Sequence, residues 1–316
     1  MSHSAKSIAI YGPTASGKTA VSLLLSEQLD IEIVSADSRQ VFRGLDIGTA
    51  KVSVHDRERI PHFGIDICDP RDSYSTGEYR RYARDVINDI KSRGHLPVVI
   101  GGTGLYVSSL VTDFLEEDVP GNDRLKVDTL RAKIHAQREA GRHEELYEEL
   151  QRVDNVSAER YADKNPRRID RALLYYYVNG EPLSRAQQTK TIPAEEDLIV
   201  FVVECDRDQL NNRIRTRVME MWDSGFENEV QNLLNLGVSP QAQSLATVGY
   251  REMLKYLDGR CSKEQAQEMM ILATRQYAKR QRTWGRHQFS SAVRLSGSPV
   301  NMVDSLLREL QARKYF

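Results

Sequence analysis

The chain has 316 residues and a net charge of −1, with 28% of its residues charged and 40% hydrophobic. This length allows one large domain or two ordinary ones, and the composition is that of a globular protein rather than a disordered one. The three cysteines, Cys68, Cys205 and Cys261, are far apart and lack zinc-ligand spacing, which indicates a reduced cytosolic protein without a disulfide framework. We see no signal peptide and no apolar run of membrane length, so we expect a cytoplasmic location.

The first predicted element is a short buried strand, Ser7–Tyr11, followed directly by GPTASGKT at 12–19 and an apolar helix at Ala20–Leu29. The octapeptide fits the phosphate-loop pattern, in which backbone N–H groups surround a phosphate, Lys18 adds a positive charge and Thr19 offers a hydroxyl to Mg²⁺. The following helix turns the positive end of its dipole toward the same anion. The alternative is a chance glycine-rich turn, which the strand, Lys-Thr pair and helix in register disfavour. The simplest ligand is a nucleotide such as ATP.

Strand and helix patterns alternate over the first hundred residues. Further strands are predicted at Ile31–Ala36, His62–Cys68 and Leu96–Gly101, with a helix at Thr76–Ser92. Such alternation predicts a parallel sheet with helices on both faces, whose ligands bind beyond the carboxyl ends of the strands. The residues that follow these strands should therefore converge on the phosphate loop.

The pattern changes at about residue 113. Residues 123–153 and 157–179 are predicted to be helical, 182–193 to be a polar connector, and Ile199–Glu204 to be a buried strand that returns to the first sheet. We therefore predict a phosphate-loop core formed by 1–114 and 196–316, with an all-helical insertion at 115–195.

Helical patterns dominate the C-terminal part of the chain. The predicted helices are Arg207–Trp222, Gly225–Leu236, Gly249–Leu257, Ser262–His287 and Pro299–Arg313. The predicted class is thus α/β: a P-loop NTPase-like parallel sheet with helices on both faces, a helical insertion and a helical C-terminal region.

Asp37 follows the second predicted strand and heads the run Asp37-Ser38-Arg39-Gln40. A carboxylate at this place can hold Mg²⁺ or accept a proton from an attacking nucleophile. It can equally cap a turn or helix, because Asp and Ser favour such positions. Its place beside the phosphate loop favours a functional role.

Arg213 and Arg217 stand four residues apart on a predicted helix, which puts both guanidinium groups on one face. Two adjacent guanidinium forks suit a diphosphate. The alternative is a solvated basic face.

Two clusters combine basic and aromatic residues. Arg167, Arg168 and Arg171 precede a run of three tyrosines, and the stretch 274–287 holds five Lys or Arg and no acid. Basic clusters near aromatic rings are typical of contact with an RNA backbone and with its bases. A merely solvated basic surface with tyrosines in the core remains possible from the pattern.

Together these segments resemble the bacterial tRNA dimethylallyltransferase family, also called isopentenyl-tRNA transferase. The resemblance covers nearly the whole chain. It is carried by GPTASGKT (12–19), SADSRQVFRGLDIGTAK (35–51), GIDICDP (64–70), IGGTGLYV (100–107), NPRRIDRAL (165–173), GFENEV (225–230), VGYREM (248–253) and TRQYAKRQRTW (274–284).

The resemblance implies transfer of a dimethylallyl group from dimethylallyl diphosphate to the exocyclic amine of the adenosine 3′-adjacent to a tRNA anticodon, in tRNAs that read codons beginning with U. Diphosphate leaves and Mg²⁺ assists. Apart from the resemblance, we expect a monomer that does not associate with a membrane. The phosphate loop then holds the diphosphate of the donor and not a nucleoside triphosphate.

The resemblance also implies the roles of individual residues. Asp37 is the general base, and Thr14, Lys18 and Arg217 act on the leaving diphosphate. The implied diphosphate-binding set is Gly12, Pro13, Thr14, Ala15, Ser16, Gly17, Lys18, Thr19, Arg213 and Arg217, with Thr19 on the metal. The implied tRNA-binding set is Asp37, Ser38, Arg39, Gln40, Thr103, Arg131, Asn165, Pro166, Arg167, Arg168, Ile169, Arg171, Arg275, Lys279, Arg280 and Gln281.

The chain departs from the family pattern at Leu174, where an acid is usual, and at Gly285, where an aromatic is common. The segment 113–131 also matches poorly, which leaves Arg124, Lys126 and Arg131 as alternatives for one basic RNA contact. Two rival functions are a nucleoside-kinase-type phosphotransferase that uses ATP, and an RNA-binding NTPase switch without covalent chemistry.

Overall fold

The computed structural model describes residues 6–112, 114–115, 124–189, 191–192 and 198–315. The chain divides into two compact units, one formed by Met1–Val111 with Glu195–Phe316 and the other by Thr112–Ala194. Each unit is described by itself below.

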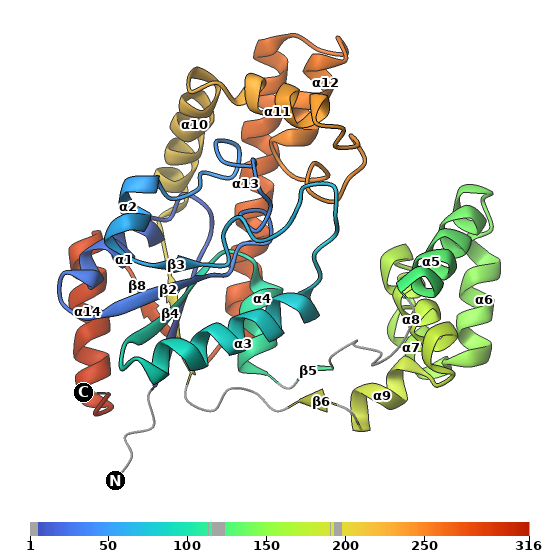
Figure 1. Cartoon of the computed structure of the whole chain (residues 1–316), viewed down its shortest axis with the longest axis horizontal. Coiled ribbons are helices and arrows are strands. Elements are labelled where there is room, and N and C mark those ends of the chain that lie inside the picture. Colours follow the sequence, from blue (N-terminus) through green and yellow to red (C-terminus); the bar gives the residue numbers. More distant parts are fainter. Residues whose placement is uncertain (1–5, 113, 116–123, 190, 193–197, 316) are drawn as a thin grey trace. The chain divides into compact units, whose positions relative to one another are not determined.

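A six-stranded parallel sheet forms the centre of the first unit, as the alternating pattern predicts (Figure 1). The strand order is β3-β2-β4-β1-β7-β8. In that order the strands span His62–Phe63, Ile31–Ser35, Leu96–Gly101, Ser7–Tyr11, Leu198–Val203 and Val293–Leu295. The last of these was not predicted, because three residues are too few for a periodic pattern.

Side chains of the central strand β1 point alternately to two cores. Ile8 and Ile10 pack with residues of α1 (Lys18–Ser26) and α14 (Pro299–Ala312), which also contact each other. Ala9 and Tyr11 pack on the opposite face with α3 (Thr76–Ser92), α4 (Gly104–Val111) and the other C-terminal helices. This alternation follows from the period-two geometry of a strand and confirms helices on both faces.

Local capping explains why α3 has the predicted bounds. Ser75 Oγ accepts a hydrogen bond from Glu78 N at 3.1 Å, and Glu78 Oε2 accepts one from Ser75 N at 2.8 Å. This reciprocal capping box fixes the first turn of the helix. Helix α1, by contrast, begins two residues before the prediction, because Gly17 adopts a left-handed conformation with φ of 93° and serves as its N-cap.

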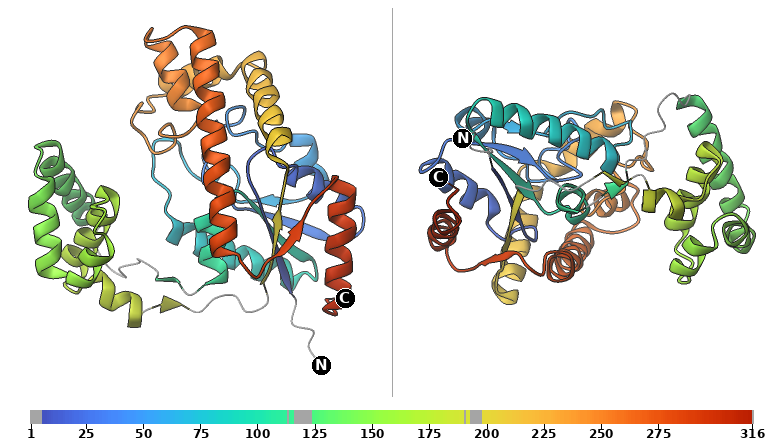
Figure 2. Two further views of the ribbon diagram at one scale, coloured as in Figure 1. Left: turned by 180° about the vertical axis from the view of Figure 1, so that it is seen from behind. Right: turned by 90° about the horizontal axis from the view of Figure 1, so that it is seen from below.

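Four helices follow β7: α10 (Arg207–Asp223), α11 (Phe226–Asn235), α12 (Tyr250–Leu257) and α13 (Lys263–Gln288). The long helix α13 packs against α10 and α12 near one part of its length and against α4, which follows β4 of the sheet, near another (Figure 2). It therefore carries residues from a sequence-distant region to the phosphate-loop side of the sheet.

Two parts of the first unit differ from the prediction. The predicted strand His62–Cys68 ends at Phe63, because Gly64 and Asp66 have positive φ and turn the chain; Cys68 then forms only an isolated bridge with Phe42. A short helix, α2 (Val54–Arg59), also lies where no helix was predicted, and Ser53 Oγ caps it by accepting from Asp56 N.

The second unit is helical, with α5 (Arg124–Glu139), α6 (His143–Val153), α7 (Asn155–Arg160), α8 (Pro166–Asn179) and α9 (Leu183–Thr189). The predicted helical blocks 123–153 and 157–179 are each split in two. Gly141 with φ of 77° ends the first helix, and Lys164 with φ of 49° before the Asn165-Pro166 cap separates the second pair. Glycine and N-terminal proline have these positional preferences for conformational reasons.

The predicted polar connector at 182–193 is wrong for its described residues. Leu183 and Ala186 of α9 are buried in the core of the second unit, together with Leu146 and Ile169. After α9, β6 (Thr191–Ile192) pairs antiparallel with β5 (Phe114–Leu115). Ser184 also donates from its hydroxyl to the buried carboxylate of Asp154. Among the described residues, no helix is long and apolar enough to cross a membrane.

Candidate active site

The phosphate loop, Gly12–Thr19, connects β1 to α1 at the carboxyl edge of the sheet, as predicted. Ala15 and Gly17 both have positive φ, 60° and 93°, so the loop turns sharply at these two residues. Within it, Thr14 N donates to Gln281 Oε1 and Ser16 N donates to Pro13 O. Lys18 Nζ folds back on the loop and donates to the carbonyl oxygens of Gly12 at 2.9 Å and Pro13 at 2.7 Å. The hydroxyl of Ser16 is buried and has no hydrogen-bond partner among the described residues. The loop thus has the form of an anion cradle.

Electrostatics single out three side chains at this loop. Burial and then the neighbouring Arg217 lower the pKa of Lys18 to about 8, while Asp37 acts in the opposite direction. Burial also lowers the pKa of Arg217, whose Nη1 donates to Thr14 Oγ1 at 3.5 Å. Two desolvated cations facing each other are costly, and an anion between them would relieve that cost.

Arg213 and Arg217 have different surroundings in the structure. Arg213 is exposed, and its Nη1 lies 3.8 Å from Cys205 Sγ. It borders a cavity of about 670 Å³ beside Pro13, together with Gln209 and further polar residues. Arg217 thus hydrogen-bonds Thr14 of the phosphate loop, whereas Arg213, one turn earlier on the same helix, borders the cavity beside Pro13.

Asp37 lies in the turn after β2 and takes the capping role, one of the two that its sequence position left open. Its Oδ1 caps the turn by accepting from Arg39 N at 2.8 Å and Gln40 N at 3.4 Å. The same carboxylate acts electrostatically on Lys18 across the site. Capping thus fixes the carboxylate in a defined orientation near the phosphate loop.

Thr103 ties the turn after β4 to the Asp37 turn. Its Oγ1 accepts from Ser38 N at 2.9 Å, and its own N–H donates to Ala36 O at 3.1 Å. The two turns are so close that a Cβ on Gly101 would lie 2.1 Å from Ala36 O. The predicted convergence of Ser38 and Thr103 at one sheet edge is therefore present.

The side chain of Gln281 on α13 is buried and is not accessible to RNA. It is 5% exposed, its Oε1 accepts from Thr14 N at 2.9 Å, and its Nε2 donates to Gly102 O at 2.8 Å. Tyr11 also donates from its hydroxyl to the carbonyl of Gln281 at 2.7 Å. The prediction that Gln281 contacts tRNA does not fit this burial; the side chain instead braces the phosphate loop against the turn after β4.

Tyr277 was absent from the predicted site. Burial, followed by the nearby charge of Asp37, raises the pKa of Tyr277 to about 12. It stands one helical turn before Gln281, so both side chains project from the same side of α13 toward the sheet edge. The four-residue spacing of Tyr277 and Gln281 could have indicated from the sequence that both residues face the sheet. The basic residues around them instead favoured an RNA-binding surface.

Arg39 and Gln40 are engaged with the protein. Arg39 Nη1 donates to Gln243 O at 2.6 Å, and Gln40 Nε2 donates to Thr49 O at 3.2 Å. Their predicted role in tRNA binding stays a prediction.

The basic residues of α13 lie along one helix. Lys279 and Arg280 are exposed, Arg275 is half-buried, and the Arg280 guanidinium lies 5.8 Å from the centroid of the Tyr277 ring. Trp284 anchors the same helix by donating from Nε1 to Ser108 Oγ at 3.1 Å.

In the second unit, the predicted basic cluster lies at the start of α8. Asn165 Oδ1 accepts from Arg167 N at 3.2 Å, Pro166 occupies the first turn, and Arg167, Arg168 and Arg171 are exposed. Arg131 on α5 is exposed as well.

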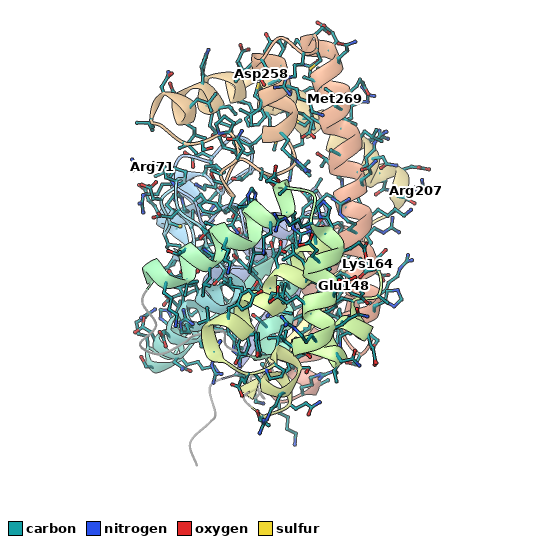
Figure 3. The ribbon with its side chains drawn as sticks, turned by 90° about the vertical axis from the view of Figure 1, so that its right-hand side faces the viewer. Arg71, Glu148, Lys164, Arg207, Asp258 and Met269 are labelled. Carbon is teal, nitrogen blue, oxygen red and sulfur yellow. The ribbon has the colours of Figure 1, made fainter. Side chains whose placement is uncertain are left out.

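Ile169 is different from these residues, because it is 2% exposed in the core of the second unit. Its prediction as a tRNA contact does not fit that position. Lys164, labelled in Figure 3, donates to Glu144 Oε2 at 2.6 Å, so acidic side chains also stand near this cluster.

A family model and the sequences of known proteins both match this chain to the same family. A family model described as IPP transferase matches residues 40–288. The chain is 41% identical over 280 residues to a protein of Pelotomaculum thermopropionicum named tRNA dimethylallyltransferase, covering 88% of this chain and 87% of the relative. It is 40% identical over 282 residues to a protein of the same name from Geobacter sulfurreducens, covering 89% of each.

Solved structures give the same result. A tRNA delta(2)-isopentenylpyrophosphate transferase of Staphylococcus epidermidis matches with a TM-score of 0.68 and 36% identity, covering 97% of this chain and 98% of that one. A eukaryotic dimethylallyltransferase, described as acting on tRNA, matches with a TM-score of 0.81 and 26% identity, covering 97% and 78%.

Proposed function

Since this chain belongs to the IPP transferase family, we propose that it transfers a dimethylallyl group from dimethylallyl diphosphate to tRNA. The acceptor is the exocyclic amine of the adenosine 3′-adjacent to the anticodon, in tRNAs that read codons beginning with U. The protein acts as a monomer in the cytoplasm. The observation that carries the proposal is the convergence of a phosphate loop, Arg217 and the Asp37 carboxylate at one sheet edge.

The donor diphosphate lies in the loop Gly12–Thr19. Backbone N–H groups, Lys18 and Arg217 surround it, and negative charge grows on its bridging oxygen as the allylic carbon–oxygen bond breaks. Groups placed in advance around a developing charge stabilise the transition state more than the ground state. The lowered pKa values of Lys18 and Arg217 support this role, because an anion restores the favourable environment of both cations.

Magnesium fits this site through the ligand. Thr19 is exposed at the first turn of α1 and offers a hydroxyl oxygen, whereas no group of three or more His, Cys, Asp or Glu able to hold a metal occurs among the described residues. Mg²⁺ commonly takes much of its coordination from substrate phosphates and water. When bound, the ion supplies positive charge that offsets the charge of the diphosphate.

Asp37 receives the proton. The amine lone pair of adenine is delocalised into the ring, so the nitrogen attacks the allylic carbon poorly on its own. As the carbon–nitrogen bond forms, the carbon–oxygen electron pair leaves with diphosphate and one N–H proton passes to the Asp37 carboxylate. The hydrogen bonds to Oδ1 from Arg39 N and Gln40 N support the role, because they hold the carboxylate in one orientation.

The tRNA is held by exposed basic side chains in both units. Lys279 and Arg280 of α13, with Arg167, Arg168 and Arg171 of α8, supply phosphate contacts. The target adenosine leaves its stack to reach Asp37, because its amine is otherwise covered by neighbouring bases.

The experiment is incubation of the protein with dimethylallyl diphosphate, Mg²⁺ and unmodified tRNA, followed by mass analysis of the tRNA nucleosides. We expect a dimethylallyl adenosine in the tRNA and released diphosphate. Parallel reactions contain ATP in place of the donor, or adenosine monophosphate in place of tRNA. Phosphoryl transfer from ATP without prenylated tRNA would overturn the proposal in favour of a phosphotransferase.

A further inference from the structure

The segment that carries Asp37 is a long irregular connection, residues 36–51, between β2 and α2. Its first part carries Asp37, whose charge acts on Lys18 of the phosphate loop, and Ser38, whose N–H donates to Thr103 Oγ1. Its last part lies against α11 and α12, which are encoded almost two hundred residues later. The geometry of this connection bears directly on where the Asp37 carboxylate stands.

The Glu229 carboxylate accepts hydrogen bonds from three consecutive backbone N–H groups, those of residues 46–48. Glu229 Oε2 on α11 accepts from Asp46 N at 2.8 Å and Ile47 N at 2.5 Å, and its Oε1 accepts from Gly48 N at 3.1 Å. Tyr250 of α12 donates its hydroxyl to the same Oε1 at 2.7 Å. Four donors on two oxygens leave this carboxylate little freedom, and charge-assisted bonds of this kind are the strong ones.

The aromatic packing around this cluster is equally specific. The rings of Phe226 and Tyr250 meet edge to face at a centroid distance of 5.0 Å. Gly48 lies directly against both rings, since a Cβ there would be 2.3 Å from Phe226 Cε2 and 2.7 Å from Tyr250 Cε2. The backbone of the segment therefore sits against α11 and α12 in one position.

Side chains within the segment connect this anchor to Asp37. Gln40, three residues after Asp37, donates from Nε2 to Thr49 O at 3.2 Å. Lys51 Nζ donates to Phe42 O at 2.7 Å. The anchored end and the Asp37 turn are thus tied together twice, so a shift at Gly48 would be transmitted to the turn.

We propose that Glu229 is a positioning residue for the transfer reaction: it holds residues 46–48 and thereby sets the position of the Asp37 carboxylate. The proposal rests on the proposed role of Asp37 as the base. Glu229 touches neither substrate nor diphosphate in this assignment.

The first test is kinetic. Glu229→Gln replaces one carboxylate oxygen by an NH₂ group that opposes N–H donors, so we expect a fall in kcat on the order of 10²-fold, the scale of a small misplacement of a catalytic group. Affinity for dimethylallyl diphosphate should be unchanged, because the phosphate loop is held by other contacts. Tyr250→Phe removes one of four donors and should lower kcat less. Glu227→Gln, the same substitution on the same helix, is the matched control and should have normal turnover.

The second test asks whether Glu229 acts through Asp37. The loss caused by Glu229→Gln should vanish in an Asp37→Ala background, measured in single-turnover reactions with nucleoside mass analysis. Multiplication of the two losses would overturn the inference, as would normal turnover of Glu229→Gln. Normal turnover of Asp37→Ala would instead refute the proposed base, which is a different outcome.

Amide hydrogen exchange provides a readout independent of turnover. Glu229→Gln should accelerate exchange in peptides covering 45–49 and also in peptides covering 37–43, whereas Glu227→Gln should change neither. Acceleration confined to 45–49 would show that the anchor does not reach Asp37 and would overturn the inference. This measurement decides the question even where the Asp37→Ala enzyme is too slow to assay.

Discussion

The two loops that meet at the proposed active site are built in opposite ways. The phosphate loop, residues 12–19, obtains much of its shape locally, from positive φ at Ala15 and Gly17 and from Lys18 bonding to its own loop carbonyls. The Asp37 segment, residues 36–51, obtains its position from Thr103 and from Glu229, which lie far away in the sequence. A loop of the first kind can be recognised by a motif, whereas one of the second kind depends on the completed fold.

The largest effect should come from the base itself. Asp37→Ala removes the proposed proton acceptor and the cap of its turn, so turnover should fall by about 10²–10⁴-fold, the range for general base catalysis. Binding of tRNA, measured by filter binding, should persist because the proposed tRNA contacts come from exposed basic residues elsewhere. Asp56→Ala, at a carboxylate of α2 away from this edge, is a suitable control; comparable activity of the two variants would contradict the role of Asp37.

The phosphate loop should show a pH dependence that the Asp37 segment does not. The folded pKa of Lys18 is about 8, below its usual value of 10.5, so the side chain loses its proton as pH rises through 8. Affinity for inorganic diphosphate should then fall by up to about tenfold per pH unit above that value, as expected for binding coupled to one proton. Titration calorimetry between pH 7 and 9 measures this.

The lowered pKa of Lys18 affects folding stability in the opposite direction to diphosphate affinity. Between pH 8 and 10.5 the unfolded chain holds the Lys18 proton more tightly than the folded chain, so this residue alone makes stability increase with pH in that window. Lys18→Arg should remove both dependences. An unchanged diphosphate affinity profile in that variant would show that another group titrates.

Gly48→Ala probes the distant anchor of the Asp37 segment. Its Cβ would collide with the Phe226 and Tyr250 rings, so we expect a loss of about 1–3 kcal/mol in the free energy of unfolding, typical of overpacking, together with reduced turnover. Chemical denaturation and single-turnover assays measure the two effects. Gly77→Ala serves as the control, because the nearest atoms to its Cβ lie at 3.9 Å.

Gln281→Ala should lower turnover least of these changes, and it tests a long-range contact that braces the phosphate loop. It leaves Thr14 N and Gly102 O without their partner, which costs about 1–3 kcal/mol for buried polar groups. Weaker diphosphate binding with little change in tRNA affinity is the expected pattern. A large loss of tRNA affinity alone would instead restore the original prediction that Gln281 contacts RNA.

The second unit shows that a stretch with many polar residues can still contain a helix buried in the core. The polar stretch around Leu183 was predicted to be a connector, but two apolar side chains at helical spacing, Leu183 and Ala186, are enough to dock α9 into the core. Ile169, grouped with neighbouring arginines by its motif, belongs to that same core. A motif lists residues in order, whereas burial depends on which face of a helix each residue occupies.

What the sequence by itself determined is local. Strands β1 and β4, helix α3 with its Ser75–Glu78 capping box, and the phosphate loop are all marked by patterns among neighbouring residues. The tertiary structure alone decided that Gln281 braces the loop, that Tyr277 lies near Asp37, that Arg213 lies beside Cys205 whereas Arg217 bonds Thr14, and that Glu229 holds the Asp37 segment. The physical reason is that these side chains find their partners only after helices distant in sequence have packed against the sheet, so no local pattern encodes the contacts.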